Sequence, residues 1–201
     1  MDNKKLIAGF GYQEGRISSW DGKRTYTQAV PQMAKHCCDN GVDEILVYDW
    51  SVTDEDHEAA IAVIKEVCRE ADAPVIAGGR VKRMEDVKKY LYAGASAVFL
   101  DMSKEENADM IKEASDRFGK EKIYAYLPTD EYIDSVKNYE AAGASVMLLN
   151  TAGSVPSLLE MASISDSEAS FLFFLQAKDD AKDTAESLKN AFGCGNICGA
   201  V

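Results

Sequence analysis

Carboxylates that follow apolar segments are the residues of this sequence best placed to do chemistry. Asp49 ends the run EILVYD and Asp101 ends the run AVFLD, and each comes shortly before a helical stretch. Two carboxylates that reach one opening can divide general acid and general base roles when their surroundings separate their pKa values. Aspartate in such a place also serves as a turn or helix-capping residue, so both interpretations stay open.

A glycine pair followed by basic residues is the second chemical signal. The letters GGRVKR at residues 78–83 follow an apolar run. Gly78 and Gly79 allow backbone N–H groups to approach a phosphate, the next helix adds the partial positive charge of its N-terminus, and Arg80 supplies a bidentate fork. The alternative is that the glycines form a tight turn and the basic side chains are solvated. We predict anion binding by these three residues.

Histidine and cysteine give no comparable signal. His36 and His57 fall on predicted helices away from strand ends, where a satisfied or solvated imidazole is the more common outcome. The five cysteines lack the paired CxxC spacing of a zinc site, and a chain of 201 residues needs no disulfide to fold. Cys37 and Cys38 are expected to pack as small apolar residues. We therefore predict neither a metal nor a cofactor.

A repeat positions these residues. Four segments share a helix end, a glycine turn and an apolar strand: CDNGVDEILVYD, YLYAGASAVFLD, YEAAGASVMLLN and NAFGCGNICGAV. Glycine tolerates the positive φ that turns a helix sharply into the next strand. Successive turn glycines lie about 50 residues apart, enough for two βα units each.

The other strands and the helices complete a pattern of eight βα units. Further buried strands are predicted at 5–10, 74–77, 122–127 and 170–175. Amphipathic helices are predicted at 27–40, 54–70, 84–93, 107–118, 132–142, 156–161 and 179–191. Alternating strands and helices require a parallel sheet, and eight units close into a (β/α)8 TIM barrel. An open doubly wound sheet is the alternative that alternation alone leaves open.

Composition narrows the classes of partner. The 201 residues fit one domain spanning 1–201, and 22 basic against 34 acidic residues give a net charge of −12. We expect no nucleic-acid partner, because a polyanion gains little from such a surface. No apolar run is long enough for a signal peptide or a membrane span, so a cytoplasmic location is predicted. No helix follows the last apolar run, at 197–201, which suggests a small barrel at the N-terminal part of a longer protein.

The middle of the chain resembles a known family. The segments LIAGFGYQEGRISS, DNGVDEILVYDWS, APVIAGGRVKRMEDVKKYLYAGASAVFLDMSKEEN and EASDRFGKEKIYAYL are similar to the histidine-biosynthesis barrels, namely the cyclase subunit of imidazole glycerol phosphate synthase and the ProFAR isomerase. The resemblance covers residues 4–127. It implies a barrel of the ribulose-phosphate-binding type, a phosphoribosyl ligand and, for the cyclase, a glutaminase partner.

A second resemblance is to the N-terminal barrel of clostridial fusion proteins. GGRVKRMEDVKKYLYAGA, SKEEN and RFGKEKI are similar to barrels that continue into phosphoribosyl-AMP cyclohydrolase and phosphoribosyl-ATP pyrophosphatase domains. On this interpretation the hydrolase activities belong to those downstream domains.

Departures from the family pattern concern the acid–base residues. The resemblance places the two catalytic aspartates of the cyclase at Gly11 and near Pro128, and neither residue type can transfer a proton. Asp130 lies two residues past Pro128 and is the nearest substitute. The glycine-rich phosphate turn after the seventh strand is replaced by the letters QAKD at 176–179. We therefore expect a catalytically degenerate barrel. The alternative is an active cyclase or isomerase, a lyase-type enzyme acting on a phosphoribosyl carboxamide, with Asp49, Asp101 and Asp130 as candidates.

Overall fold

A computed structural model describes residues 7–18, 20, 25–26, 29–39, 42–128, 135–150, 170–174 and 197–200 of the chain. Strands and helices alternate along these residues, as the repeat predicts.

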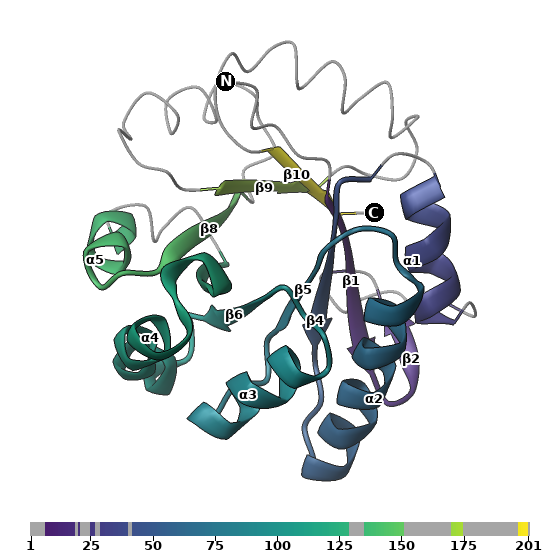
Figure 1. Cartoon of the computed structure of the whole chain (residues 1–201), viewed down its shortest axis with the longest axis horizontal. Helices are drawn as coiled ribbons and strands as arrows, with labels where there is room; N and C mark the ends of the chain where they lie inside the picture. Colours follow the sequence, from purple (N-terminus) through teal and green to yellow (C-terminus); the bar gives the residue numbers. More distant parts are fainter. Residues whose placement is uncertain are drawn as a thin grey trace.

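Eight strands run parallel and follow the chain order across one sheet. They are β1 (Ile7–Gln13), β4 (Glu44–Asp49), β5 (Val75–Gly78), β6 (Ala97–Asp101), β7 (Ile123–Leu127), β8 (Ser145–Asn150), β9 (Ser170–Phe174) and β10 (Ile197–Ala200). Strands β1 and β10 lie side by side, with Cα atoms within 8 Å, so the sheet curves round to meet itself (Figure 1). The predicted (β/α)8 barrel is confirmed, and the open sheet is excluded.

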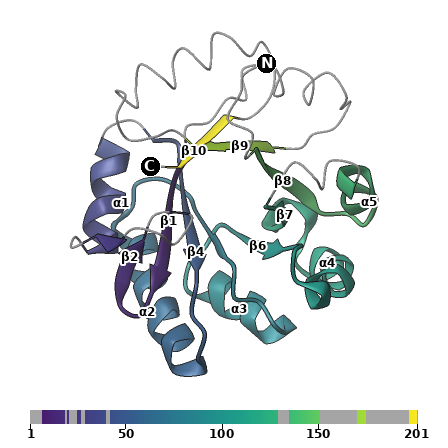
Figure 2. The ribbon, with the colours of Figure 1, turned by 180° about the vertical axis from the view of Figure 1, so that it is seen from behind.

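Helices cover the outside of the ring, as the view from behind also shows (Figure 2). They are α1 (Val30–Asp39), α2 (Asp54–Glu70), α3 (Met84–Tyr92), α4 (Glu105–Phe118) and α5 (Val136–Ala141), with a short 3-10 helix, η1 (Lys120–Lys122), before β7. The helices predicted at 156–161 and 179–191 lie outside the described residues. Within the described part of the chain, every helix is too short or too polar to cross a bilayer.

Helix α2 has the predicted bounds, whereas α4 begins two residues before its predicted start at residue 107. The Thr53 side chain accepts a hydrogen bond from the Asp56 backbone N–H at 3.1 Å and caps the first turn. Three acidic residues in that turn complement the helix dipole. The predicted apolar face is buried at Ala60, Ile64 and Val67.

The buried residues form two layers separated by the strands. One layer lies between strands and helices and includes Ile45 and Val47 of β4. The other lies on the interior face of the barrel and includes Leu46 and Tyr48 of the same strand. Because side chains alternate across a strand, each residue belongs to the layer of the residues two positions away.

An antiparallel hairpin after β1 was not predicted. Strand β1 runs on to Gln13, past the predicted end at residue 10, and pairs with β2 (Arg16–Ser18), which pairs with β3 (Thr25–Tyr26). Glu14 and Gly15 both have positive φ, 49° and 77°, as a two-residue primed turn requires. The chain beyond β2 brings Trp20, which is 3% exposed, into the barrel interior.

Candidate functional site

Among the described residues, aromatic side chains pack together on the interior face of the barrel, near the ends of β4, β6 and β7. The Tyr48 ring stacks on Trp50 at 3.9 Å between centroids and meets Trp20 edge-on at 5.3 Å. Trp20 also packs on Phe99 and Tyr126, and its indole N–H donates to the Tyr126 hydroxyl at 3.0 Å. These five residues, which we call the aromatic plug, occupy space that a ligand in the interior would need.

Asp101 is the predicted acid–base candidate that faces this interior. It lies four positions after Ala97 and two after Phe99 in β6, so its side chain is on the same face of the strand as theirs, in the interior layer. The Tyr48 hydroxyl donates to Asp101 Oδ2 at 2.5 Å, and the backbone N–H and hydroxyl of Ser103 donate to Oδ1 at 3.0 and 2.7 Å. The carboxylate therefore acts as a turn residue whose two oxygens are both engaged.

Asp49 faces the opposite way. Asp49 is on the same face of β4 as Ile45 and Val47, so its side chain lies between β4 and the helices. Asp49 Oδ2 accepts from the Tyr90 hydroxyl at 2.8 Å and lies 2.7 Å from His57 Nδ1. Its Oδ1 accepts from the Ser51 backbone N–H at 2.9 Å, another turn contact.

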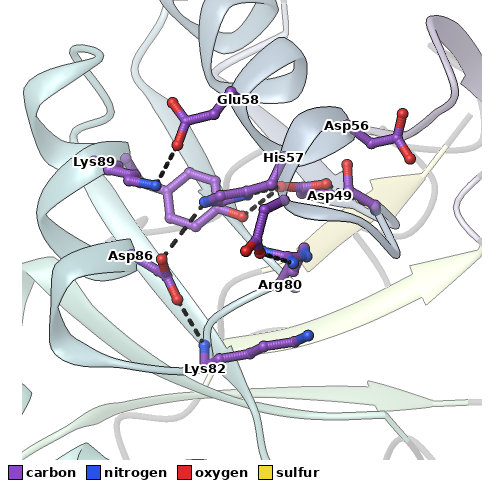
Figure 3. A network of polar contacts seen from close by, with 12 residues as sticks. Asp49, Asp56, His57, Glu58, Arg80, Lys82, Asp86 and Lys89 are labelled. Atoms are coloured by element: carbon purple, nitrogen blue, oxygen red, sulfur yellow. Dashed lines mark hydrogen bonds and ion pairs between the residues drawn. The ribbon is translucent and has the colours of Figure 1, made fainter.

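This second cluster continues to α3 (Figure 3). His57 is 1% exposed, and its Nε2 lies 3.8 Å from Asp86 Oδ1. We call Asp49, His57, Asp86 and Tyr90 the buried polar cluster; it ties β4 to α2 and α3. His57 was predicted to be satisfied or solvated and away from strand ends; it is instead buried against Asp49 at the end of β4, and its Nε2 has no hydrogen-bond partner among the described residues.

The structure thus does not bring the predicted carboxylates together. Asp49 and Asp101 lie on opposite faces of the sheet, and only Asp101 adjoins the interior. The third candidate, Asp130, lies outside the described residues. The described part of the chain therefore contains no pair of carboxylates at the mouth that can share a proton transfer.

Close contacts with neighbouring residues explain why both predicted phosphate-binding positions, 78 and 79, are glycines. A Cβ at Gly78 would meet the Phe99 backbone oxygen at 2.1 Å. Gly79 has a φ of 101°, and its Cβ would meet the Tyr48 ring at 2.5 Å. Both positions require glycine for packing, which supports the alternative that the pair forms a tight turn.

The helix N-terminus after these glycines already holds an anionic group. Asp86 Oδ2 accepts from the backbone N–H groups of Lys82 and Arg83 at 3.1 and 3.2 Å. These are the donors that a phosphate would use at the start of α3. The backbone part of the predicted anion site is occupied by the chain's own carboxylate, so cationic side chains must carry any anion binding there.

Arg80 is neither solvated nor free. Its side chain is 5% exposed, and its Nη2 donates to Asp54 Oδ1 at 2.5 Å and weakly to the Val52 backbone oxygen at 3.5 Å. The alternative of a solvated basic residue is wrong for this position, because the guanidinium is buried beside α2.

Lys104, at the N-terminus of α4, was not predicted as a site residue. Its ammonium group donates to the Gly79 backbone oxygen, which places a cation next to the predicted anion site. Burial lowers the pKa of Lys104, and the neighbouring Asp101 carboxylate opposes this effect. The position of Lys104 shortly after a β-strand was the only sequence feature that could have marked it as a site residue. The local sequence does not show in which direction a long lysine side chain points.

Gly11 has no room for a side chain. A Cβ at this position would lie 2.1 Å from Ser18 Oγ and 2.8 Å from Trp50 Nε1. Both of these polar atoms are buried and have no hydrogen-bond partner among the described residues. The hairpin and the aromatic plug therefore occupy the space beside Gly11.

Metal and thiol chemistry receive no support from the described residues. These residues contain no group of three or more His, Cys, Asp or Glu side chains arranged to hold a metal ion. Cys37 and Cys38 are partly buried against the core, as predicted. Burial, and then the neighbouring Cys38, raises the pKa of Cys37 to about 11, which disfavours the reactive thiolate.

Comparison with known proteins decides the family. A model described as "Histidine biosynthesis protein" matches residues 14–137, more than half of the chain. The chain belongs to this family. The imidazole glycerol phosphate synthase subunit HisF of Staphylococcus aureus strains Newman, COL and MRSA252 is in each case 30% identical over 137 residues, which are 67% of this chain and 53% of the relative.

This histidine-biosynthesis barrel therefore spans about half the length of the curated relatives that it matches, 53% of each. The matched range begins after β1 and Gly11, and it includes β2, the aromatic plug and the buried polar cluster. The resemblance inferred from the sequence is confirmed at the level of the family.

Buried tyrosines give the histidine-biosynthesis barrel an expected alkaline response. Burial, together with Asp101 and Asp49 respectively, raises the pKa values of Tyr48 and Tyr90, and burial raises that of Tyr126. A raised folded-state pKa stabilises the protein below the unfolded value of about 10 and loses this contribution as the pH rises further. We expect the free energy of unfolding to fall above about pH 10.

Ultraviolet phenolate absorbance and circular dichroism, followed together, measure this response. Some of the nine tyrosines should ionise only when the secondary structure is lost. Ionisation of all nine while the circular dichroism stays native would contradict the prediction.

Proposed function

We propose that this chain is a catalytically degenerate histidine-biosynthesis barrel that retains a phosphoribosyl ligand at its rim and serves a larger assembly. The observation that carries this proposal is the filled space beside Gly11. The family resemblance places a catalytic aspartate there, whereas Ser18 and Trp50 lie where even a Cβ would stand. The chain supports binding at its rim better than chemistry in its interior.

The remaining carboxylates support the loss of catalysis. Asp101 reaches the interior, but Tyr48 and Ser103 engage both of its oxygens. Asp49 lies in the helix-facing layer, 1% exposed. A general base needs hydrogen-bond reach to a substrate proton, and both groups are buried, with Asp49 1% and Asp101 5% exposed.

Cationic side chains at the ends of β5 and β6 support anion retention. Arg80 and Lys104 lie in the two loops that follow these neighbouring strands, and Lys104 contacts the Gly79 backbone. Lys82 is close enough to Lys104 to lower its pKa. A phosphate group carries the charge and the acceptor oxygens that such a cluster recognises. Arg80 and Lys104 are thus the binding residues of the proposed site, beside the glycine turn.

The proposed assembly is one in which the barrel accompanies other histidine-pathway activities in the cytoplasm. We infer that it is a single domain in a longer protein whose downstream domains are a phosphoribosyl-AMP cyclohydrolase and a phosphoribosyl-ATP pyrophosphatase. A separate glutaminase is the other partner consistent with the relatives' family. The resemblance of residues 78–95, 103–107 and 117–123 to the clostridial fusion proteins supports the first of these partners.

An active cyclase or isomerase is the second candidate function. One observation favours it: Asp101 remains at the interior end of β6, with the Lys104 ammonium nearby. This candidate requires a second acid–base group, for which Asp130 is the proposed residue, and it requires that the aromatic plug move aside.

Calorimetric titration with ribose 5-phosphate, followed by a turnover assay, tests the proposed function. We expect binding without turnover of a phosphoribosyl carboxamide in the presence of ammonia. Lys104→Gln should weaken binding about tenfold or more, because a hydrogen bond to a charged group is lost. Lys112→Gln is the matched control, since Lys112 lies on the outer surface of α4, paired with Asp116. Measurable turnover abolished by Asp101→Asn would instead establish the second candidate.

A further inference from the structure

The ion pair between Arg80 and Asp54 is strongly asymmetric. The Arg80 side chain is 5% exposed, whereas the Asp54 side chain is 85% exposed. One carboxylate oxygen of Asp54 contacts one terminal nitrogen of the guanidinium. Arg80 Nε is buried and has no hydrogen-bond partner among the described residues, so the fork of donors is only partly used.

Several cations surround this one exposed carboxylate. The hydrogen bond and the charge of Arg80 lower the pKa of Asp54, and Arg83 and Lys82 lower it further. Arg80 and Lys82 come from the loop after β5 and lie below the first turn of α2 (Figure 3). The electrostatic potential at this position therefore favours an anion, and the Asp54 carboxylate is the anion that occupies it.

The Asp54 carboxylate is largely hydrated already and loses little when it turns into the solvent. The buried guanidinium would then lack a counter-ion, so Asp54 leaves at low cost only when another anion takes its place. A phosphate has more charge and more acceptor oxygens than a single carboxylate oxygen, and it can bind the guanidinium through two donors. Phosphate and Asp54 thus compete for the same buried cation.

We propose that Asp54 is an internal competitor that occupies the guanidinium of Arg80 and must be displaced before a phosphorylated ligand binds there. This inference rests on the proposed function, because it assigns a regulating contact to the same anion site. It predicts that the affinity for phosphate depends on the position of one carboxylate in α2, in addition to the charge of the protein as a whole.

Isothermal titration with inorganic phosphate and with ribose 5-phosphate tests this proposal on the full chain. We expect Asp54→Asn to lower the dissociation constant of both ligands about two- to sixfold, the range that a solvated ion pair allows. Glu55→Gln is the matched control: it removes the same charge one residue away, and Glu55 is exposed. It should change the dissociation constant less, because Arg80 is paired with Asp54 rather than with Glu55, whose charge is exposed to solvent.

The Arg80 Nε–H resonance, followed by nuclear magnetic resonance during the titration, gives a second readout that needs no substitution of the buried arginine. It should shift on phosphate addition, and at lower phosphate concentration in the Asp54→Asn protein. Equal affinities for the Asp54→Asn and Glu55→Gln proteins, with the resonance still shifting, overturn the competition but keep the proposed binding function. Failure of both proteins and of the wild type to bind either ligand overturns the binding function itself.

Discussion

Replacing Asp49 with alanine is expected to lower the free energy of unfolding by about 3–5 kcal/mol, the range for breaking a buried charged group away from its partners. The substitution leaves the Ser51 backbone N–H, the Tyr90 hydroxyl and His57 Nδ1 without the acceptor that they share. All of these groups lie between β4 and the helices, where water cannot replace the lost contacts. Urea unfolding followed by circular dichroism measures the change.

Two further variants distinguish the contribution of the buried polar cluster to stability from the general effect of substituting a residue. Tyr90→Phe removes one donor and should cost about 1 kcal/mol. Glu66→Ala removes an exposed carboxylate from the middle of α2 and should leave the unfolding midpoint unchanged within error. A loss below about 1 kcal/mol for Asp49→Ala would show that the buried polar cluster does not stabilise this part of the barrel.

Restoring a carboxylate at Gly11 is expected to destabilise the barrel and to give no activity. Gly11→Ala should cost about 1–3 kcal/mol through overpacking against Ser18 and Trp50, and Gly11→Asp should cost more, because it also buries a charge. The double variant Gly11→Ala with Ser18→Gly should regain at least half of the loss, since it removes the nearest clashing atom. Unfolding of the single and double variants forms a double-mutant cycle that measures this coupling.

Gly15→Ala is the control for the cycle at Gly11. Gly15 has a φ of 77°, and a Cβ at this position would have no atom within 4 Å, so alanine there meets only backbone strain. Ser18→Gly should not rescue this variant. If Gly11→Asp folded with unchanged stability and gained cyclase or isomerase turnover, the proposal that a filled interior explains the lost chemistry would be abandoned.

The order of strands and helices was predictable because local signals mark it. Glycine turns such as Gly94, with a φ of 108°, and Gly143, with a φ of 86°, end helices where the repeat places them. Helix α2 has the predicted bounds because its capping residue and its acidic first turn are adjacent in sequence. The hairpin after β1 was missed, since β2 and β3 are short and carry no extended apolar alternation.

The face on which each aspartate lies was not predictable. A strand buried on both sides reads as a continuous apolar run, so the runs ending at Asp49 and Asp101 look alike. In the closed barrel the two aspartates lie on opposite faces of the sheet. The Asp49 carboxylate faces the helices, and the Asp101 carboxylate faces the interior.

Resemblance of particular segments to known barrels indicated the family. The sequence by itself also determined the eight parallel strands and the glycine turns, because apolar patterns and turn residues act over a few neighbouring positions. Only the tertiary structure decided that Asp54 pairs with Arg80, that Tyr90 donates to Asp49 and that Trp20 enters the interior. These contacts join residues whose side chains meet only when the barrel closes. The partner of a long polar side chain depends on which groups are near it in space, and not on which are near it along the chain.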